Sequence, residues 1–272
     1  MRLHKLLPLL LATGIAPAAF GSVYVSDFTG SDLGDPLPGI DGWSQSEANP
    51  TDDFSPLSWI SNHAGDLAAT VGTYYDVPAN DPLYVSRTIG VPLAGSTLEM
   101  TFGIQDSTTA YPDRNNFYIQ ITDGSGLLAT DLFSLVFTAT DQDSDYDDPL
   151  DPTELATANT QWDMNVTSNG NSFTEFGGII EDGSYNMFLA FTQDGADMDY
   201  SLTIQGPMNS YTTNGTLTGL GNETFSELRV GTTMGDGADW GDNFFAFRGI
   251  PEPGSMALVA FSALGLALRR RR

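Results

Sequence analysis

Apolar and polar residues alternate with a period of two over much of the chain. Apolar side chains occupy every second position at 98–104, 117–121 and 198–204. Successive side chains of a strand point to opposite faces, so this pattern predicts strands with one buried face. The sequence predicts further strands at 23–28, 83–89, 132–140, 185–192, 225–232 and 243–249.

No segment between the two ends of the chain combines a helical period with helix caps. Most of the 29 glycines lie between the apolar stretches, where the turns of an antiparallel sheet need them. A single all-β sandwich can reach roughly 200 to 250 residues. We therefore predict one all-β domain over 23–249, an antiparallel two-sheet β-sandwich of the jelly-roll type.

The first 22 residues have the layout of a secretory signal peptide. Arg2 and Lys5 give a basic start, residues 6–12 are apolar, and small residues follow. Signal peptidase would cut after Gly21, or alternatively after Ala18. Cysteine is absent, so the exported domain has no disulfides to stabilise it.

The last residues, 250–272, combine three unlike elements. Pro251, Glu252 and Pro253 precede an apolar stretch at 254–268, which is followed by Arg269, Arg270, Arg271 and Arg272. A helix of this stretch would be about 22 Å long, short of the roughly 30 Å hydrocarbon core. We predict a short transmembrane helix with its arginines on the cytoplasmic side, which holds the domain outside the inner membrane after export.

This tail resembles the PEP-CTERM sorting signal of Gram-negative bacteria that carry an exosortase and commonly make exopolysaccharide. The resemblance rests on Pro251, Glu252 and Pro253, the apolar stretch and the terminal arginines. It implies that an exosortase recognises the tail and removes it near the Pro-Glu-Pro motif. It also implies delivery of the domain to the cell surface or the extracellular matrix.

A second resemblance concerns the domain itself. The opening segment, 27–43, and the closing segment, 240–253, are similar to the first and last strands of concanavalin-like or laminin G-like domains. Such domains are jelly rolls, so this resemblance implies the same fold as the alternating pattern.

The charge of the domain excludes two classes of partner. Residues 22–250 contain four arginines, no lysine and 34 acidic residues, which gives a net charge of −30. A surface this acidic repels the phosphates of nucleic acids and anionic lipid headgroups. We therefore expect no nucleic-acid partner.

An acidic segment at 141–154 is a candidate calcium site. Its seven acids include five at positions 1, 3, 5, 9 and 12 of a calcium-binding loop, namely Asp143, Asp145, Asp147, Asp151 and Glu154. The sixth position is Asp148 where such loops usually have glycine. Structural Ca²⁺ and a solvated acidic loop are thus both open interpretations.

The residues needed for catalysis are few. His63 is the only histidine of the domain, and we expect it to be an exposed loop residue; nucleophile-elbow and zinc-helix motifs are absent. Most tryptophans are expected in the core, whereas Tyr74, Tyr75 and Tyr111 lie in turn-rich segments and could stack on sugar rings.

The sequence as a whole favours a noncatalytic protein of the cell surface or matrix that binds exopolysaccharide, calcium or both. One alternative is a secreted glycan-active hydrolase that uses a pair of carboxylates. Another is a purely structural surface-layer protein.

Overall fold

The computed structural model describes residues 21–46, 58–72, 83–106, 116–125, 129–139, 161–168, 171–180, 183–207, 209–233 and 243–249. Within these ranges the chain forms fifteen strands and a short 3-10 turn, η1 (Ile40–Gly42). None of this part of the chain forms a helix long and apolar enough to cross a membrane. The predicted helix at 254–268 and residues 1–20 of the predicted signal peptide lie outside the described ranges.

One sheet has eight strands, in the order β13-β12-β11-β6-β15-β4-β3, with β1 paired to β6. Its strands are β1 (Gly21–Val23), β3 (Ser58–His63), β4 (Asp66–Gly72), β6 (Ser96–Asp106), β11 (Tyr185–Asp194), β12 (Asp197–Gln205), β13 (Ser210–Leu217) and β15 (Asn243–Gly249). The β1–β6 pairing is parallel.

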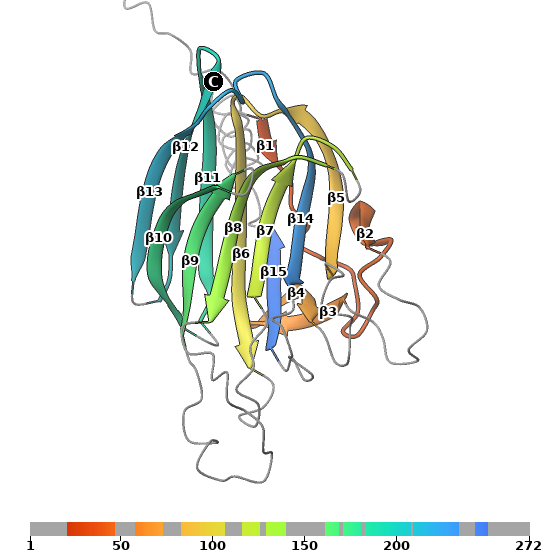
Figure 1. The fold of residues 1–272 in the computed structure, drawn as a ribbon. Coiled ribbons are helices and arrows are strands. Elements are labelled where there is room, and N and C mark those ends of the chain that lie inside the picture. Colours follow the sequence, from red (N-terminus) through yellow and green to blue (C-terminus); the bar gives the residue numbers. More distant parts are fainter. Residues whose placement is uncertain are drawn as a thin grey trace, which may run out of the picture.

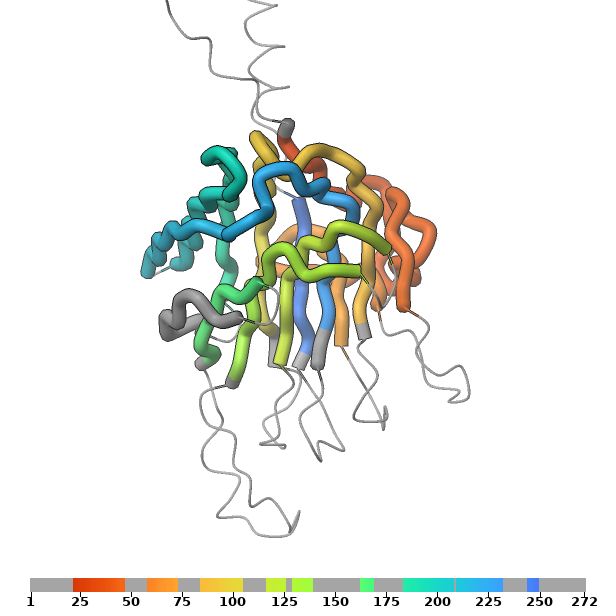
Figure 2. Tube along the Cα trace, turned by 45° about the horizontal axis from the view of Figure 1, so that its top comes forward, coloured from red at the N-terminus to blue at the C-terminus, as the bar shows by residue number. Residues whose placement is uncertain are grey.

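The other sheet has seven strands, in the order β10-β9-β8-β7-β14-β5-β2. Its strands are β2 (Trp43–Gln45), β5 (Leu83–Pro92), β7 (Asn116–Thr122), β8 (Asp131–Ala139), β9 (Gln161–Ser168), β10 (Asn171–Ile180) and β14 (Thr224–Thr233). All of its pairings are antiparallel. Figures 1 and 2 show the two sheets as layers, with β13 at one side of the sandwich and β2 at the opposite side.

Aromatic rings from both sheets interlock in the core. Phe245 of β15 lies 5.3 Å from Phe137 of β8 and 5.6 Å from Phe117 of β7, measured between ring centroids. Phe133 of β8 meets Phe191 of β11 edge to face at 5.7 Å. These contacts join the sheets face to face, which confirms the predicted two-sheet sandwich.

Most predicted strands are present, but the one predicted at 23–28 is wrong. The strand there, β1, ends at Val23. Phe28 has φ 55°, and its backbone N–H donates to the Ser26 hydroxyl at 2.9 Å, so the chain turns where the alternation suggested extension. The opening segment 27–43 likewise contains no strand before β2.

The prediction that His63 is an exposed loop residue is also wrong. It ends β3 and is only 4 % exposed. A Cβ atom at Gly103 would lie 2.3 Å from its imidazole ring, so glycine at that position makes room for the histidine.

Candidate functional site

Alternation along β14 sends two charged side chains away from the core. Leu228 and Val230 point into the sandwich, so Glu227 and Arg229 lie on the opposite face of the seven-stranded sheet. The neighbouring strands carry polar or tyrosine side chains at the matching positions. We call this set the polar face: Tyr84 and Ser86 of β5, Glu227, Arg229 and Gly231 of β14, Tyr118, Gln120 and Thr122 of β7, and Asp131 and Ser134 of β8.

Strand register arranges these residues in three rows across the sheet. The central row runs Ser86, Arg229, Gln120, Ser134. A second row places Glu227, Thr122 and Asp131 side by side. The third places Gly231 between Tyr84 and Tyr118.

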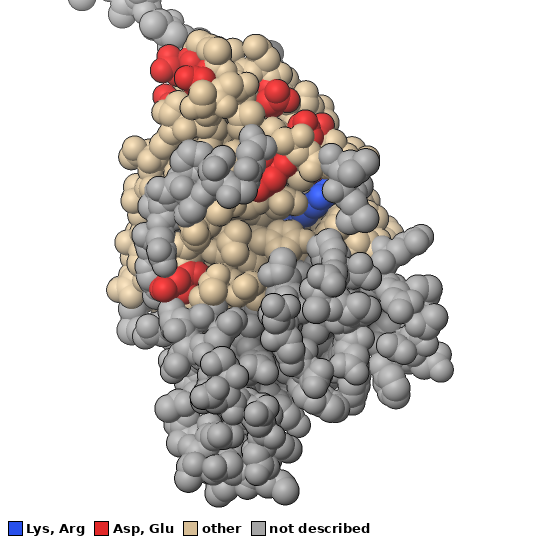
Figure 3. All heavy atoms as spheres, in the orientation of Figure 1, with Lys and Arg blue, Asp and Glu red and all other residues tan. Residues whose placement is uncertain are grey.

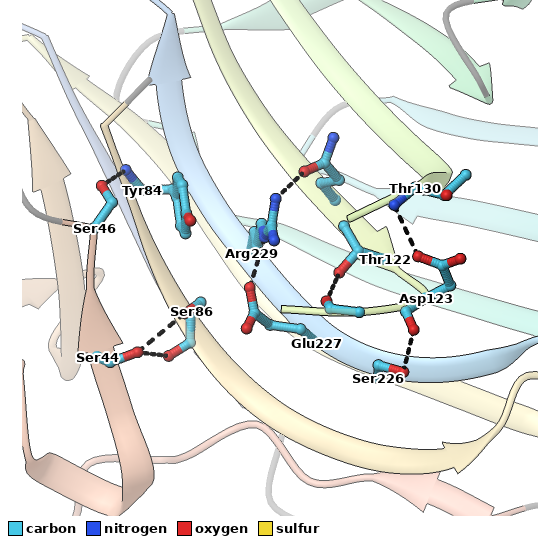
Figure 4. A network of polar contacts seen from close by, with 12 residues as sticks. Ser44, Ser46, Tyr84, Ser86, Thr122, Asp123, Thr130, Ser226, Glu227 and Arg229 are labelled. Carbon is cyan, nitrogen blue, oxygen red and sulfur yellow. Dashed lines mark hydrogen bonds and ion pairs between the residues drawn. The ribbon is translucent and has the colours of Figure 1, made fainter. Parts of the chain in front are cut away.

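A buried ion pair lies at the centre of the polar face. Arg229 Nε donates to Glu227 Oε1 at 2.6 Å, and both side chains are 7 % exposed. Arg229 Nη1 also donates to Gln120 Oε1 at 3.5 Å, and the guanidinium lies 4.7 Å above the centre of the Tyr84 ring. Figure 4 shows Arg229 between Tyr84 on one side and Thr122 on the other. The arginine is thus engaged on several sides.

Burial also perturbs two neighbouring groups. It raises the pKa of the Tyr118 hydroxyl above its ordinary value, an effect that the nearby Arg229 charge partly offsets. It raises the pKa of Asp131 to about 6, although a hydrogen bond from the Ser134 hydroxyl at 2.8 Å works in the opposite direction. Tyr118 therefore stays a neutral hydrogen-bonding group.

Hydrogen bonds at both sides hold the strands of this face in register. The Ser46 hydroxyl accepts from the Tyr84 backbone N–H at 3.0 Å, and the Ser44 and Ser86 hydroxyls lie 3.0 Å apart. Beyond β7, Asp123 accepts from the Thr130 N–H at 2.7 Å through its carboxylate (Figure 4). On the face seen in Figure 3, basic atoms gather in one place, in a hollow beside acidic atoms.

Because the pKa of Asp131 is raised, we expect the stability of the fold to depend on pH. A carboxyl group whose pKa is higher in the folded protein stabilises the fold when protonated, and that contribution is lost as pH rises from about 4 through 6. Asp131→Asn should therefore raise the free energy of unfolding at pH 7 relative to the unchanged protein. The expected gain is on the order of 1 to 2 kcal/mol, because partial solvation reduces the effect of the shift.

The gain in stability from Asp131→Asn should shrink as the pH approaches 4. Urea unfolding of the variant and of the unchanged protein at several pH values measures this gain. Asp194→Asn, at the exposed end of β11, controls for the loss of one negative charge. A gain from Asp131→Asn that stays the same from pH 4 to pH 7 would contradict the assignment.

The sites predicted from sequence fall outside the described residues. This holds for the sorting motif and the terminal arginines, for the calcium candidates at 143–154, and for Tyr74, Tyr75 and Tyr111. Of the tryptophans, Trp43 and Trp162 are buried in the core as expected.

The acidic and histidine side chains in the described part of the chain are not grouped as metal ligands. No group of three or more histidine, aspartate or glutamate side chains there could hold a metal ion. Two acids of the β11–β12 hairpin instead accept hydrogen bonds: Asp197 from the Gly219 N–H at 2.8 Å and Asp199 from the Thr216 hydroxyl at 2.6 Å. Calcium binding by the acidic segment stays a prediction.

A comparison with known protein families identifies the C-terminal tail. Residues 249–272 match the family model described as the PEP-CTERM protein-sorting motif. The chain carries a PEP-CTERM sorting signal. This confirms the resemblance that Pro251, Glu252 and Pro253 suggested. The PEP-CTERM motif implies sorting by an exosortase and export to the cell envelope or surface. It covers only the tail and says nothing of what the domain does.

Several solved structures are similar to the chain at low sequence identity. No curated protein matches the sequence. Winged bean acidic lectin complexed with methyl-alpha-D-galactose matches with 11% identity, a TM-score of 0.44, and coverage of 81% of this chain and 97% of the lectin. A Bacteroides ovatus GH16 protein in complex with a product matches with 7% identity, a TM-score of 0.44, and coverage of 82% and 96%.

A third match is the CBM2 module of the evolved Dit of Lactobacillus casei BL23 phage J-1. Its identity is 12%, its TM-score is 0.45, and the match covers 84% of this chain and 96% of the module. All three TM-scores are below 0.5. The two sheets themselves therefore establish the fold.

Proposed function

We propose that the protein is delivered by an exosortase to the cell surface or extracellular matrix of a Gram-negative bacterium, where its domain binds polysaccharide without cleaving it. The polar face would be the binding surface. Signal peptidase and exosortase would process the two ends of the chain, and the inner membrane would hold the tail only in transit.

The PEP-CTERM motif at 249–272 is the observation that carries the first part of the proposal. The motif begins at Gly249, the last residue of β15, and Pro251 lies beyond that strand. Removal of the tail near Pro251 would thus leave every strand of the domain in place.

The polar face supports the second part. Sugars are recognised by planar polar side chains that hydrogen-bond their hydroxyls and by aromatic rings that contact their apolar faces. Gln120 and Asp131, which are partly exposed, provide the first kind of group, and Tyr84 and Tyr118, each 8 % exposed, provide the second. Because all four lie on paired strands, their positions are fixed by the sheet before any ligand binds.

Changing Pro251, Glu252 and Pro253 together to alanine should prevent removal of the tail. The full-length chain would then accumulate in the inner membrane, because recognition by the exosortase requires the motif. Immunoblotting of membrane and surface fractions, in host cells with and without an exosortase gene, measures the outcome. Ser255→Ala, just beyond the motif, is the matched control and should be processed normally.

Normal processing of the triple variant would overturn the sorting part of the proposal.

The alternative function, a glycan-active hydrolase, is tested by incubating the purified protein with polysaccharides. Release of reducing ends from any polysaccharide, lost on Asp131→Asn or Glu227→Gln, would favour the hydrolase over the noncatalytic binder.

A further inference from the structure

The strand β13 ends the eight-stranded sheet at one side of the sandwich (Figures 1 and 2). Among the described residues, β12 is its only strand partner. An edge strand offers a row of backbone N–H and C=O groups to any further strand. Proteins usually protect such edges with charged residues, proline, bulges or a short length.

The other three edges of the two sheets have such protection. The strand β2 has only three residues, and β10 is broken by two shifts in its register with β9. The outer side of β3 is covered by the segment 34–37. The Ile60 N–H donates to the Asp35 carbonyl at 2.8 Å, and the Ile60 carbonyl accepts from the Gly34 N–H at 2.8 Å. None of these edges therefore offers a long and regular row of backbone groups.

The strand β13 differs from them in length, regularity and charge. It is eight residues long, and its register with β12 has no shift from Ser210 to Leu217. It contains no charged residue and no proline, and its threonines and tyrosine favour an extended backbone. Residues 22–250 have a net charge of −30, so two copies repel each other over most of their surfaces. An uncharged edge is a place where they can approach.

The register shows which backbone groups of β13 point outward. In the hairpin turn the Gly206 N–H donates to the Asn209 carbonyl at 2.8 Å, so these two residues form a hydrogen-bonded pair. Such pairs alternate along antiparallel strands, so every second residue of β13 points its N–H and C=O away from β12. These outward residues, whose side chains are also exposed, are Ser210, Thr212, Asn214 and Thr216. In the described part of the chain, no other backbone group bonds to their outward side.

This outward row is complementary to itself. A two-fold axis at Thr213 places Thr212 opposite Asn214 of a second copy, and Ser210 opposite Thr216 of that copy. Every outward N–H and C=O then has a partner. The opposed side chains are small or polar and uncharged, so no like charges face each other across the contact.

The nearest acid of β12 does not oppose this pairing. Asp199 lies beside Thr216 and accepts from its hydroxyl at 2.6 Å. Antiparallel pairing puts Thr216 of the two copies at opposite ends of the contact, about 20 Å apart along the strand. This separation exceeds the Debye length of about 8 Å at physiological salt, so the repulsion between the two carboxylates is screened.

We propose that β13 is the contact strand of a homodimer, in which two copies pair their β13 strands antiparallel about a two-fold axis at Thr213. The pairing joins the two eight-stranded sheets into one. It occupies the one unprotected edge among those that the structure describes, so the assembly stops at two copies. This inference does not depend on polysaccharide binding.

The symmetry has a consequence for the polar face. Antiparallel strands of one sheet are related by an axis perpendicular to that sheet, so both seven-stranded sheets lie on the same side of the joined sheet. The two polar faces then point in the same direction. A dimer could thus contact one long polymer at two places, which strengthens binding without any new contact within a copy.

Single cysteines test the pairing, because the unchanged chain has none. Thr213→Cys places two sulfur atoms across the axis, in a non-hydrogen-bonded pair with Cα atoms about 4.5 Å apart, which suits a disulfide. Ser210→Cys is the control: Ser210 is more exposed than Thr213, but its two copies would be about 20 Å apart. Mild oxidation of the full-length chain in mild detergent, followed by non-reducing electrophoresis, measures the rate of linking. We expect Thr213→Cys to link at least about tenfold faster than Ser210→Cys.

A proline substitution tests the hydrogen bonds themselves. Asn214→Pro removes an outward N–H but keeps the bonds between β12 and β13, a position where edge strands tolerate proline. It should weaken dimerisation at least about tenfold in sedimentation at several protein concentrations, and should slow the linking of Thr213→Cys to match. Asn214→Ser keeps the N–H and should dimerise normally. Thermal unfolding verifies that each variant is folded; if Asn214→Pro is not, the two cysteine variants decide.

Three results would overturn the homodimer. The first is linking of Thr213→Cys that is no faster than that of Ser210→Cys, since chance collisions favour the more exposed thiol. The second is sedimentation of the unchanged chain as a monomer at about 0.1 mM, a concentration at which weak interfaces still assemble. The third is a Thr213→Cys product, in oxidised extracts of the producing cells, that joins the chain to a protein of different mass. That product would assign the edge to another partner.

Discussion

Phe245→Ala is expected to lower the free energy of unfolding by about 3 to 5 kcal/mol, the range typical of removing a buried phenylalanine. The Phe245 ring is fully buried. It stacks on Phe102 of its own sheet at 5.5 Å and contacts Phe117 and Phe137 of the facing sheet. Its removal leaves a cavity where the two sheets meet, and rigid strands on both sides cannot collapse to fill it.

Urea unfolding of the purified protein measures the loss. Phe188→Ala is the matched control, because Phe188 lies on the outer face of β11 and is only partly buried. We expect it to cost about 1 kcal/mol. Similar losses at both positions would show that the ring contacts across the sandwich do not dominate the stability of the core.

The alternating pattern predicted much of the fold because it reports which side of a strand is buried. It succeeded at 98–104 and 198–204, where β6 and β12 contribute large apolar side chains to the core. It missed six strands, β2, β3, β4, β9, β10 and β13. Alanine and glycine in β4 are poor strand formers, and β13 is an edge strand with few apolar residues, so neither shows a clear pattern.

The candidate site could not be predicted in the same way. From the sequence, functional residues were expected in loops rich in acids or tyrosines. The structure instead places the polar cluster on the strands themselves, and Glu227 and Arg229 gave a local signal only by alternating with Leu228 and Val230. Their neighbours Tyr84 and Gln120 come from β5 and β7, so the cluster depends on strand register, which one sequence does not determine.

The second large effect on stability is expected from the buried ion pair between Glu227 and Arg229. Glu227→Ala should lower the free energy of unfolding by about 3 to 5 kcal/mol, because it leaves the Arg229 charge buried without its carboxylate partner. The double variant Glu227→Ala/Arg229→Ala should recover part of this loss, since it removes the unpaired charge. A double-mutant cycle from urea unfolding then gives the coupling energy of the pair.

A second ion pair in the same protein serves as the control. Arg248 and Asp66 are also 2.6 Å apart, but their side chains are 23 % and 54 % exposed. Asp66→Ala should therefore cost less than about 1 kcal/mol, because water screens the charges and solvates whichever partner remains. With the distance held equal, burial is the variable that separates the two pairs. Losses of the same size for Glu227→Ala and Asp66→Ala would mean that water reaches the centre of the polar face.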